Sequence, residues 1–122
     1  MRRTVKAGKT EMFSQKYLVA GETGKGYGLY RMVAESRGVN MRQVARMIRK
    51  MDYSEFLSTR YWKLVVQQVL HEAGWRCKKC GRRDHLVVHH PDYRIHGYEM
   101  YHADELQCLC IYCHDRIHGI RN

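Results

Sequence analysis

Hydrophobic residues recur at helical spacing through the middle of the chain and predict three helices. Two short helices are predicted within residues 29–51, separated at Gly38, with Asn40 as the N-cap of the second. In the third helix, from Asp52 to Ala73, apolar residues repeat about every fourth position, and Gly74 is a suitable C-cap. Such a stripe is typical of a helix face that packs into a core.

Towards the C-terminus the pattern changes to short, strand-like runs. Residues 86–88 are apolar and lead directly into His89 and His90, which predicts a short strand that ends at these histidines. A second strand is predicted around 106–109, and a helix from Tyr112 to Ile120. The predicted fold class is therefore α+β, with a helical N-terminal region followed by a small unit of two strands and a helix.

The chain divides into three predicted segments. Residues 1–28 are rich in lysine, arginine and glycine and predict a basic arm, which either lies along DNA phosphates or forms a disordered tail. Residues 29–52 form a helical hairpin or a helix-turn-helix-like segment. Residues 53–122 form the C-terminal domain, which contains the candidate chemistry.

The segment 29–52 resembles a helix-turn-helix. Ala34, Gly38 and Val44 fall where that motif needs a small residue at the helix crossing, a glycine in a left-handed turn and a buried apolar residue. On this interpretation the second helix presents four residues to the major groove of DNA: Met41, Arg42, Gln43 and Arg46. The alternative is a plain helical hairpin that packs on the C-terminal domain.

The net charge favours a protein that binds nucleic acid, and the lack of long apolar runs argues against a secreted or membrane protein. The chain of 122 residues has 22 lysines and arginines against 12 acidic residues, a net charge of +10, which favours polyanions such as nucleic acid as partners. A soluble basic protein without a nucleic-acid role has the same charge. The N-terminus lacks the apolar run of a secretory signal, and no apolar stretch is long enough to span a membrane. We therefore expect a cytosolic protein with reduced thiols.

Five cysteines and eight histidines are many for a chain this short, and small chains often use a metal to stabilise their fold. Cys77 and Cys80 form one Cys-x-x-Cys unit, and Cys110 and Cys113 form another about thirty residues later. Together the four thiolates predict a tetrahedral structural zinc site. Cys108 is predicted to be a buried thiol rather than a fifth ligand.

Four histidines predict a second metal site with open coordination positions. His114 and His118 are four residues apart on the last predicted helix, so both rings lie on one face and can share a metal ion. His89 is the third candidate ligand, which leaves positions for water and a phosphate oxygen. His90 points to the opposite face of the strand and is free to act as a general base. The alternative is that these histidines are surface or packing residues.

The order of these motifs resembles that of the HNH endonuclease superfamily, the ββα-metal nucleases. The resemblance covers about residues 53–120 and depends on four matching pieces: Cys77-x-x-Cys80, the His89-His90 pair, the block from Leu109 to His114, and the closing His118-Gly119. It implies a small zinc-containing ββα module, with His90 as the general base. It further implies one catalytic divalent ion (Mg²⁺, Mn²⁺, Ni²⁺ or Zn²⁺) with three ligands: His89, His114 and His118.

One residue departs from the family's pattern. Glu105 stands at the middle position of the motif, which is usually an asparagine that orients the general base. Carboxylates often orient imidazoles, so we expect Glu105, or its neighbour Asp104, to brace His90. On this expectation Glu105 belongs to the catalytic set.

The resemblance implies an enzyme that hydrolyses phosphodiester bonds of double-stranded DNA, through nicking or double-strand cleavage. It also implies a monomer or homodimer in the cytoplasm of a bacterial or phage-infected cell. Arg94 and Arg116 are predicted to contact phosphates, although solvated surface charge explains either equally well. Two alternatives stay open: a non-catalytic zinc-containing module that binds DNA, and a nuclease that prefers RNA or single strands.

Overall fold

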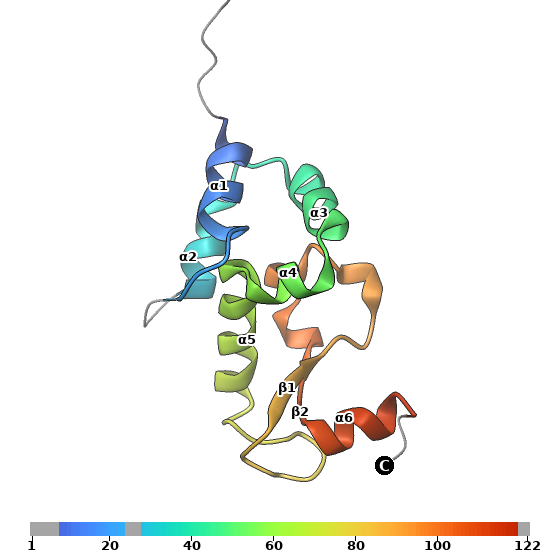
Figure 1. The fold of residues 1–122 in the computed structure, drawn as a ribbon. Coiled ribbons are helices and arrows are strands. Elements are labelled where there is room, and N and C mark those ends of the chain that lie inside the picture. Colours follow the sequence, from blue (N-terminus) through green and yellow to red (C-terminus); the bar gives the residue numbers. More distant parts are fainter. Residues whose placement is uncertain (1–7, 24–27, 120–122) are drawn as a thin grey trace, which may run out of the picture.

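A computed structural model describes residues 8–23 and 28–119 of the chain (Figure 1). The fold is α+β, as predicted: helices gather at one end, and a two-stranded antiparallel sheet with a following helix lies at the other (Figure 1). Part of the predicted basic arm, residues 1–7 and 24–27, lies outside the described residues. None of the helices in the described part of the chain is long and apolar enough to cross a membrane.

Helix α1 (Lys9–Tyr17) lies within the segment that was predicted as an arm, so that prediction is wrong for these residues. Phe13 and Tyr17, four residues apart, share one face of the helix, with ring centroids 4.8 Å apart, and both are buried in the core. The Tyr17 hydroxyl also donates a hydrogen bond to Glu35. Packing of these two aromatic rings stabilises a helix within a segment whose basic, glycine-rich composition predicts an arm.

Helices α2 (Gly28–Glu35) and α3 (Met41–Lys50) confirm the two predicted short helices. Gly38 in the turn has φ +78°, a left-handed conformation that favours glycine. The Asn40 side chain accepts a hydrogen bond from the backbone N–H of Gln43, as expected for an N-cap. Between them, these two local signals set where the chain turns and where α3 begins.

The long helix predicted from Asp52 to Ala73 is divided in the structure into α4 (Tyr53–Ser58) and α5 (Arg60–Glu72). The break is at Thr59, whose backbone is extended (φ −69°, ψ 150°) and pairs with Ala20 in an isolated β-bridge. The Thr59 hydroxyl accepts from the N–H of Trp62 and donates to the carbonyl of Phe56. Threonine can thus cap α5 through its side chain, an option that the apolar periodicity does not reveal.

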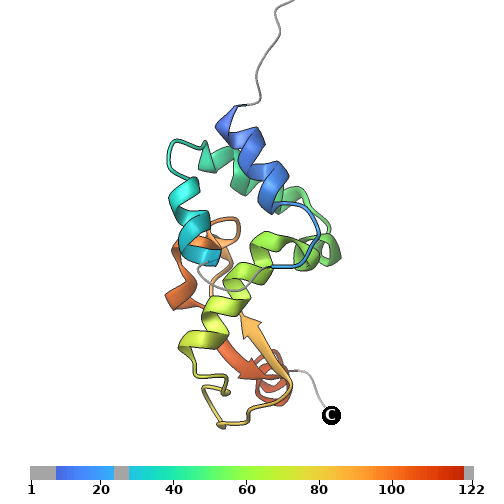
Figure 2. The ribbon, with the colours of Figure 1, turned by 90° about the vertical axis from the view of Figure 1, so that its left-hand side faces the viewer.

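Helix α5 connects the two ends of the molecule, running from the helical group down to the sheet (Figure 2). Its buried face includes the fully buried Tyr61 and Val65, and its C-terminus is followed by Gly74 with φ +67°, as predicted. The core continues from the helices to residues of the sheet and of the loop between its strands: Ile95, Met100, Leu106 and Cys108. This larger of the two hydrophobic clusters among the described residues therefore holds the sheet against the helices, while the smaller one surrounds Leu109 beside the cysteines.

The sheet consists of β1 (Leu86–His89) and β2 (Gln107–Cys110), which pair antiparallel with Leu86 opposite Cys110 and His89 opposite Gln107. Helix α6 (Ile111–Ile117) follows β2 directly. The segment 90–106, here called the inter-strand loop, contains three short 3₁₀ turns: η1 (Tyr93–Ile95), η2 (Glu99–Tyr101) and η3 (Ala103–Glu105). Both strands and the last helix occur where the sequence predicts them.

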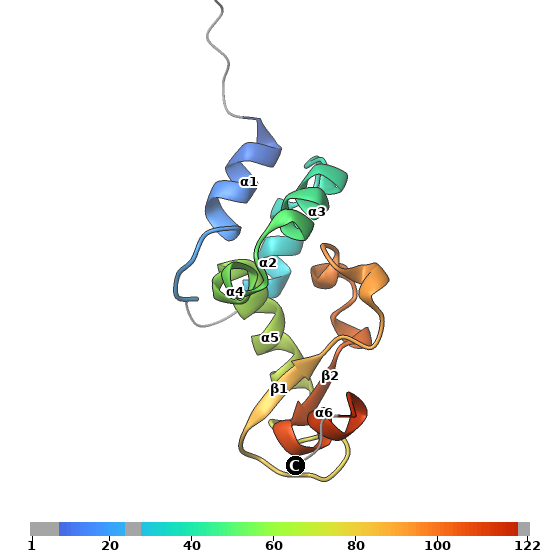
Figure 3. The same cartoon turned by 45° about the vertical axis from the view of Figure 1, so that its right-hand side comes forward.

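Helix α3 packs directly on the inter-strand loop. A Cβ atom at Gly97 would lie only 2.8 Å from the Cα of Ala45, so the two backbones approach as closely as glycine allows. One helical turn later, Arg49 donates to the carbonyls of His96, at 2.9 Å, and Arg94, at 3.3 Å. The N-terminal helices are thus packed against the loop that follows His90. From top to bottom in Figure 3, α3, the loop and α6 lie along one side of the molecule.

Candidate metal centres and the histidine cluster

The four cysteines of the two Cys-x-x-Cys units come together, as predicted, and could hold a structural metal ion such as zinc. One ligand atom from each of Cys77, Cys80, Cys110 and Cys113 lies within 4.8 Å of the others. The sulfurs of Cys80 and Cys110 are 3.6 Å apart. A tetrahedral zinc ion with Zn–S bonds of about 2.3 Å requires sulfurs roughly 3.8 Å apart, so the spacing fits this metal.

In both Cys-x-x-Cys units, a backbone N–H group is directed at the sulfur of the first cysteine. The N–H of Cys80 points at the sulfur of Cys77, and the N–H of Cys113 points at the sulfur of Cys110. Burial opposes ionisation of Cys77, but hydrogen bonds from backbone N–H groups outweigh it and lower its pKa to about 6. Burial and the neighbouring thiols raise the pKa of Cys113 to about 12. Four crowded thiols can all ionise only with a cation among them, and a zinc ion would supply that charge.

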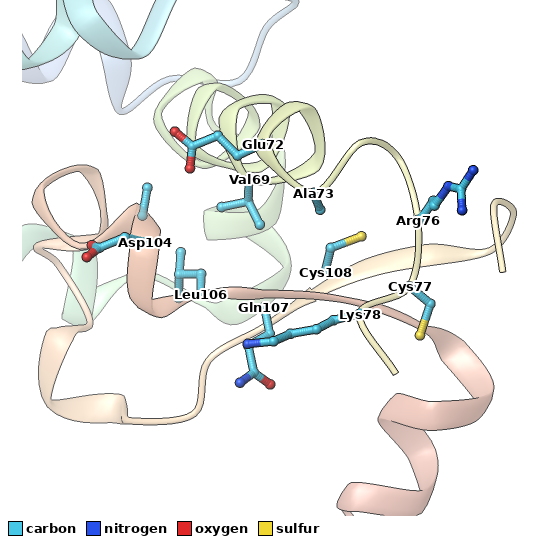
Figure 4. Close-up of a pocket in the computed structure, with 11 residues that line it drawn as sticks. Val69, Glu72, Ala73, Arg76, Cys77, Lys78, Asp104, Leu106, Gln107 and Cys108 are labelled. Atoms are coloured by element: carbon cyan, nitrogen blue, oxygen red, sulfur yellow. The ribbon is translucent and has the colours of Figure 1, made fainter. Parts of the chain in front are cut away.

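Cys108 is separate from this cluster, in agreement with its prediction as a buried thiol. Its side chain is directed towards α5 and Ala73, whereas that of Cys77 points away from it (Figure 4). Burial raises the pKa of Cys108, which keeps the thiol protonated. Both cysteines line a surface pocket of about 430 Å³ between the end of α5, the first Cys-x-x-Cys unit and β2 (Figure 4). None of the histidines discussed below lines this pocket.

The three histidines predicted to share a metal ion are also brought together. His89 ends β1, His114 lies on α6 and His118 is its C-cap residue, and their ligand atoms lie within 4.8 Å of one another. The Nε2 atoms of His114 and His118 are 3.2 Å apart. Two imidazoles on one tetrahedral zinc ion have nitrogens about 3.3 Å apart, given Zn–N bonds of about 2.0 Å. The donor set therefore fits a divalent metal.

The environment of His89 favours the form that binds metal. Its ring is 5.4 Å from that of His114 and 5.0 Å from that of His118, and the residue is buried. Burial, followed by the charges that the neighbouring imidazoles would carry, lowers the pKa of His89. A neutral imidazole has a free lone pair for a metal ion, whereas a protonated one does not.

His90 lies in a different cluster, as the alternation of side chains along a strand predicts. Its ring is stacked between Trp62 of α5, with centroids 5.0 Å apart, and Tyr93 of η1, at 5.5 Å, and the ring planes are nearly parallel. Its Nε2 atom is 3.1 Å from a carboxylate oxygen of Glu99. Stacking and this hydrogen bond together fix the orientation of the ring.

Glu99 is the centre of this second cluster. The residue is fully buried in η2, and its carboxylate also contacts Nδ1 of His96 at 2.7 Å, the hydroxyl of Tyr61 and the N–H of Gly97. Burial alone would raise the pKa of this carboxyl, but hydrogen bonds from His90, His96 and Tyr61 outweigh it and lower the pKa to about 2. Glu99 is thus a buried, ionised carboxylate.

The sequence gives no indication of Glu99, and the residue that was expected to brace His90 lies elsewhere. The side chain of Glu105 is half-exposed and pairs with Nδ1 of His102 at 2.5 Å, so its bracing role is a wrong prediction. Asp104 is exposed and does not supply the contact to His90 either. Both follow η2 in the short turn η3, which precedes β2, whereas η2 itself points its Glu into the core.

The residues predicted to contact DNA lie on the surface, with one qualification for Arg94. Arg42, Gln43 and Arg46 are exposed on α3, and Arg116 is exposed on α6. Arg94 is also exposed, but its guanidinium forms a bidentate pair with Asp92, with contacts of 2.8 and 3.0 Å to one carboxylate oxygen. This pairing offsets part of the positive charge that Arg94 presents.

The helix-turn-helix pattern is met in two of its three positions. Val44 is fully buried and Gly38 adopts the left-handed turn, whereas Ala34 is exposed instead of lying at a close helix crossing. One face of α3, at Ala45 and Arg49, packs on the inter-strand loop, as the hairpin alternative predicts. The neighbouring face keeps its basic residues exposed.

Comparisons with protein-family models, with curated proteins and with solved structures found no significant match to this chain.

Proposed function

We propose that this protein is a metal-dependent DNA endonuclease of the HNH type. The observation that carries the proposal is the separation of two adjacent histidines. His89 joins His114 and His118 in a set that fits a divalent ion, while His90, one residue later, joins a buried carboxylate. A three-imidazole set leaves coordination positions open, unlike the closed four-cysteine set, and that difference distinguishes catalytic from structural metal sites.

In this proposal His89, His114 and His118 hold the ion, and their imidazole nitrogens favour a transition metal over Mg²⁺, which prefers oxygen ligands. The ion, when bound, stabilises the negative charge that develops on phosphate and leaving-group oxygens. His90 takes a proton from the attacking water as the general base. The four cysteines hold a structural zinc ion and take no part in the chemistry.

DNA is the proposed substrate because basic residues flank the histidines. Arg42 and Arg46 are exposed on α3, Arg116 is exposed on α6, and these helices lie on either side of the inter-strand loop (Figures 1 and 3). The net charge of +10 attracts a polyanion over a longer range. A duplex along this side of the molecule would contact α3 and α6 together, and binding should weaken steeply with added salt.

The test is cleavage of supercoiled plasmid by the zinc-loaded protein with added Mg²⁺, Mn²⁺, Ni²⁺ or Zn²⁺. We expect nicked or linear product with at least one metal. His90→Ala should abolish cleavage while DNA binding persists, and His89→Ala should weaken the metal response. His71→Ala is the matched control, because His71 is an exposed histidine on α5, and it should cleave like the wild type.

The same assay separates the alternatives. Tight DNA binding with intact plasmid under every metal contradicts the enzyme and supports a non-catalytic zinc-containing module. The coverage of His90 by Trp62 and Tyr93, which leaves 7% of its side chain exposed, is the observation that favours this alternative. Degradation of RNA or single-stranded DNA with intact duplex contradicts the substrate assignment alone.

A further inference from the structure

The carboxylate of Glu99 accepts hydrogen bonds on both oxygens. Oε1 receives the hydroxyl of Tyr61 and the N–H of Gly97, each at 2.9 Å. Oε2 lies 3.1 Å from Nε2 of His90 and 2.7 Å from Nδ1 of His96. Glu99 is fully buried, and these four groups surround its charge.

An ionised carboxylate can only accept hydrogen bonds, so each imidazole nitrogen that faces Oε2 must bear a proton. A neutral imidazole has one N–H, and the other nitrogen is then a free acceptor. In the neutral form of each ring, His90 therefore has its proton at Nε2 and a free Nδ1, and His96 has its proton at Nδ1 and a free Nε2. The two rings meet edge to face, with centroids 5.9 Å apart.

We propose that Glu99 is a positioning residue that holds His90 in the Nε2–H tautomer, so that Nδ1 is the nitrogen that accepts the proton of water. The hydrogen bonds of Glu99 connect three parts of the fold: Tyr61 lies on α5, Gly97 lies in the part of the inter-strand loop that packs against α3, and His90 directly follows β1. The catalytic consequence rests on the proposed function, whereas the tautomer itself does not.

The first experiment needs no substitution in the cluster. Nitrogen-15 NMR of the zinc-loaded full chain, recorded at one fixed pH above 7, distinguishes protonated from free ring nitrogens, and His90→Gln assigns the His90 signals. We expect His90 as Nε2–H and His96 as Nδ1–H. A wild-type His90 in the Nδ1–H form overturns the proposal, whatever the protein does to DNA.

Glu99→Gln tests the cause. Its amide oxygen should stay with the N–H of Gly97, because an NH₂ group there would face a donor. The NH₂ group then faces both imidazoles and donates to them, which forces His90 into the Nδ1–H tautomer. We expect kcat to fall on the order of 100-fold or more, with KM little changed, because a carboxylate-to-amide change that gives the wrong tautomer has this kind of effect in the serine protease triad.

Glu105→Gln is the control for the tautomer, because Glu105 makes the same type of contact with a different ring, His102. It should leave the His90 signals unchanged. An unchanged His90 tautomer in Glu99→Gln overturns the proposal, and so does a changed tautomer with full cleavage activity. If the wild type does not cleave, a tautomer that changes in Glu99→Gln still supports the role of Glu99, while the proposed function fails.

Discussion

Gly97 is the position where a single methyl group should be most damaging. It has φ +100°, and a Cβ atom there would lie 2.7 Å from the Cβ of Ala45, 2.8 Å from its Cα and 3.1 Å from its carbonyl oxygen. Cβ atoms in proteins essentially never approach other heavy atoms within 3.0 Å, so the first two contacts cannot be accommodated in place. Two of the three neighbours are backbone atoms of α3, which cannot rotate away. Gly97→Ala must therefore separate α3 from the inter-strand loop.

The expected cost has two parts. Placing an L-residue in a left-handed conformation costs about 1–2 kcal/mol, and φ +100° lies beyond the small region that such residues tolerate. Overpacking against a rigid neighbour adds about 1–3 kcal/mol. We therefore expect Gly97→Ala to lower the free energy of unfolding by about 2–5 kcal/mol, a large share of the stability of a small protein.

Gly74→Ala is the matched control, because Gly74 has φ +67° and no atom within 4 Å of the added Cβ. It isolates the conformational part of the cost. Both variants should be unfolded by urea at a fixed free zinc concentration, with circular dichroism as the signal. Equal destabilisation of the two variants would refute the close contact between Gly97 and α3.

Three further predictions concern metal, burial and pH. Cys77→Ser should lose the structural zinc and lower Tm on the order of 10 °C or more, because metal binding contributes directly to folding, whereas Cys108→Ala should retain zinc by metal analysis. Tyr61→Phe should lower the free energy of unfolding by about 1–3 kcal/mol, because Glu99 loses a hydrogen bond and the N–H of Met100 loses its acceptor. An unchanged midpoint of urea unfolding would contradict this prediction. Burial raises the pKa of Glu35, but hydrogen bonds from Lys16 and Tyr17 outweigh it and leave the pKa below 4.5. The ionised carboxylate therefore stabilises the fold above about pH 4.5, and this stabilisation is lost as pH falls through the folded pKa. The stability difference between wild type and Glu35→Gln, at most about 1 kcal/mol for a partly solvated pair, should accordingly shrink from pH 7 to pH 3, and a difference that grows on acidification would contradict the sign.

Elements with a strong local signal could be predicted from the sequence. Asn40 and Gly38 fixed the start of α3 and the turn before it, and the apolar run into His89 located β1. The break at Thr59 could not be predicted in this way, because it depends on a bridge to Ala20, almost forty residues earlier. Contacts between distant segments override local periodicity. Helix α1 is a second example, because its aromatic residues pack in the core formed with the later helices.

In the candidate site, too, residues at regular spacing could be predicted and residues placed by distant contacts could not. Ligands at regular spacing, such as His114 and His118, were identifiable because spacing on a helix determines which side chains meet. Glu99 was not, because an acidic residue in an irregular loop has the same sequence signature whether it is buried or exposed. Glu105 illustrates the difficulty: it was expected at His90, but the loop turns its carboxylate to His102.

The adjacency of His89 and His90 has a consequence for how the chain tolerates insertions and deletions. Side chains alternate along β1, so one residue added or removed within Leu86–His89 would exchange the faces to which the two rings point. Residues 81–85 are exposed and precede the strand, and a change of length there leaves that alternation intact. Variation in chain length should therefore accumulate before Leu86 and be absent from the strand itself.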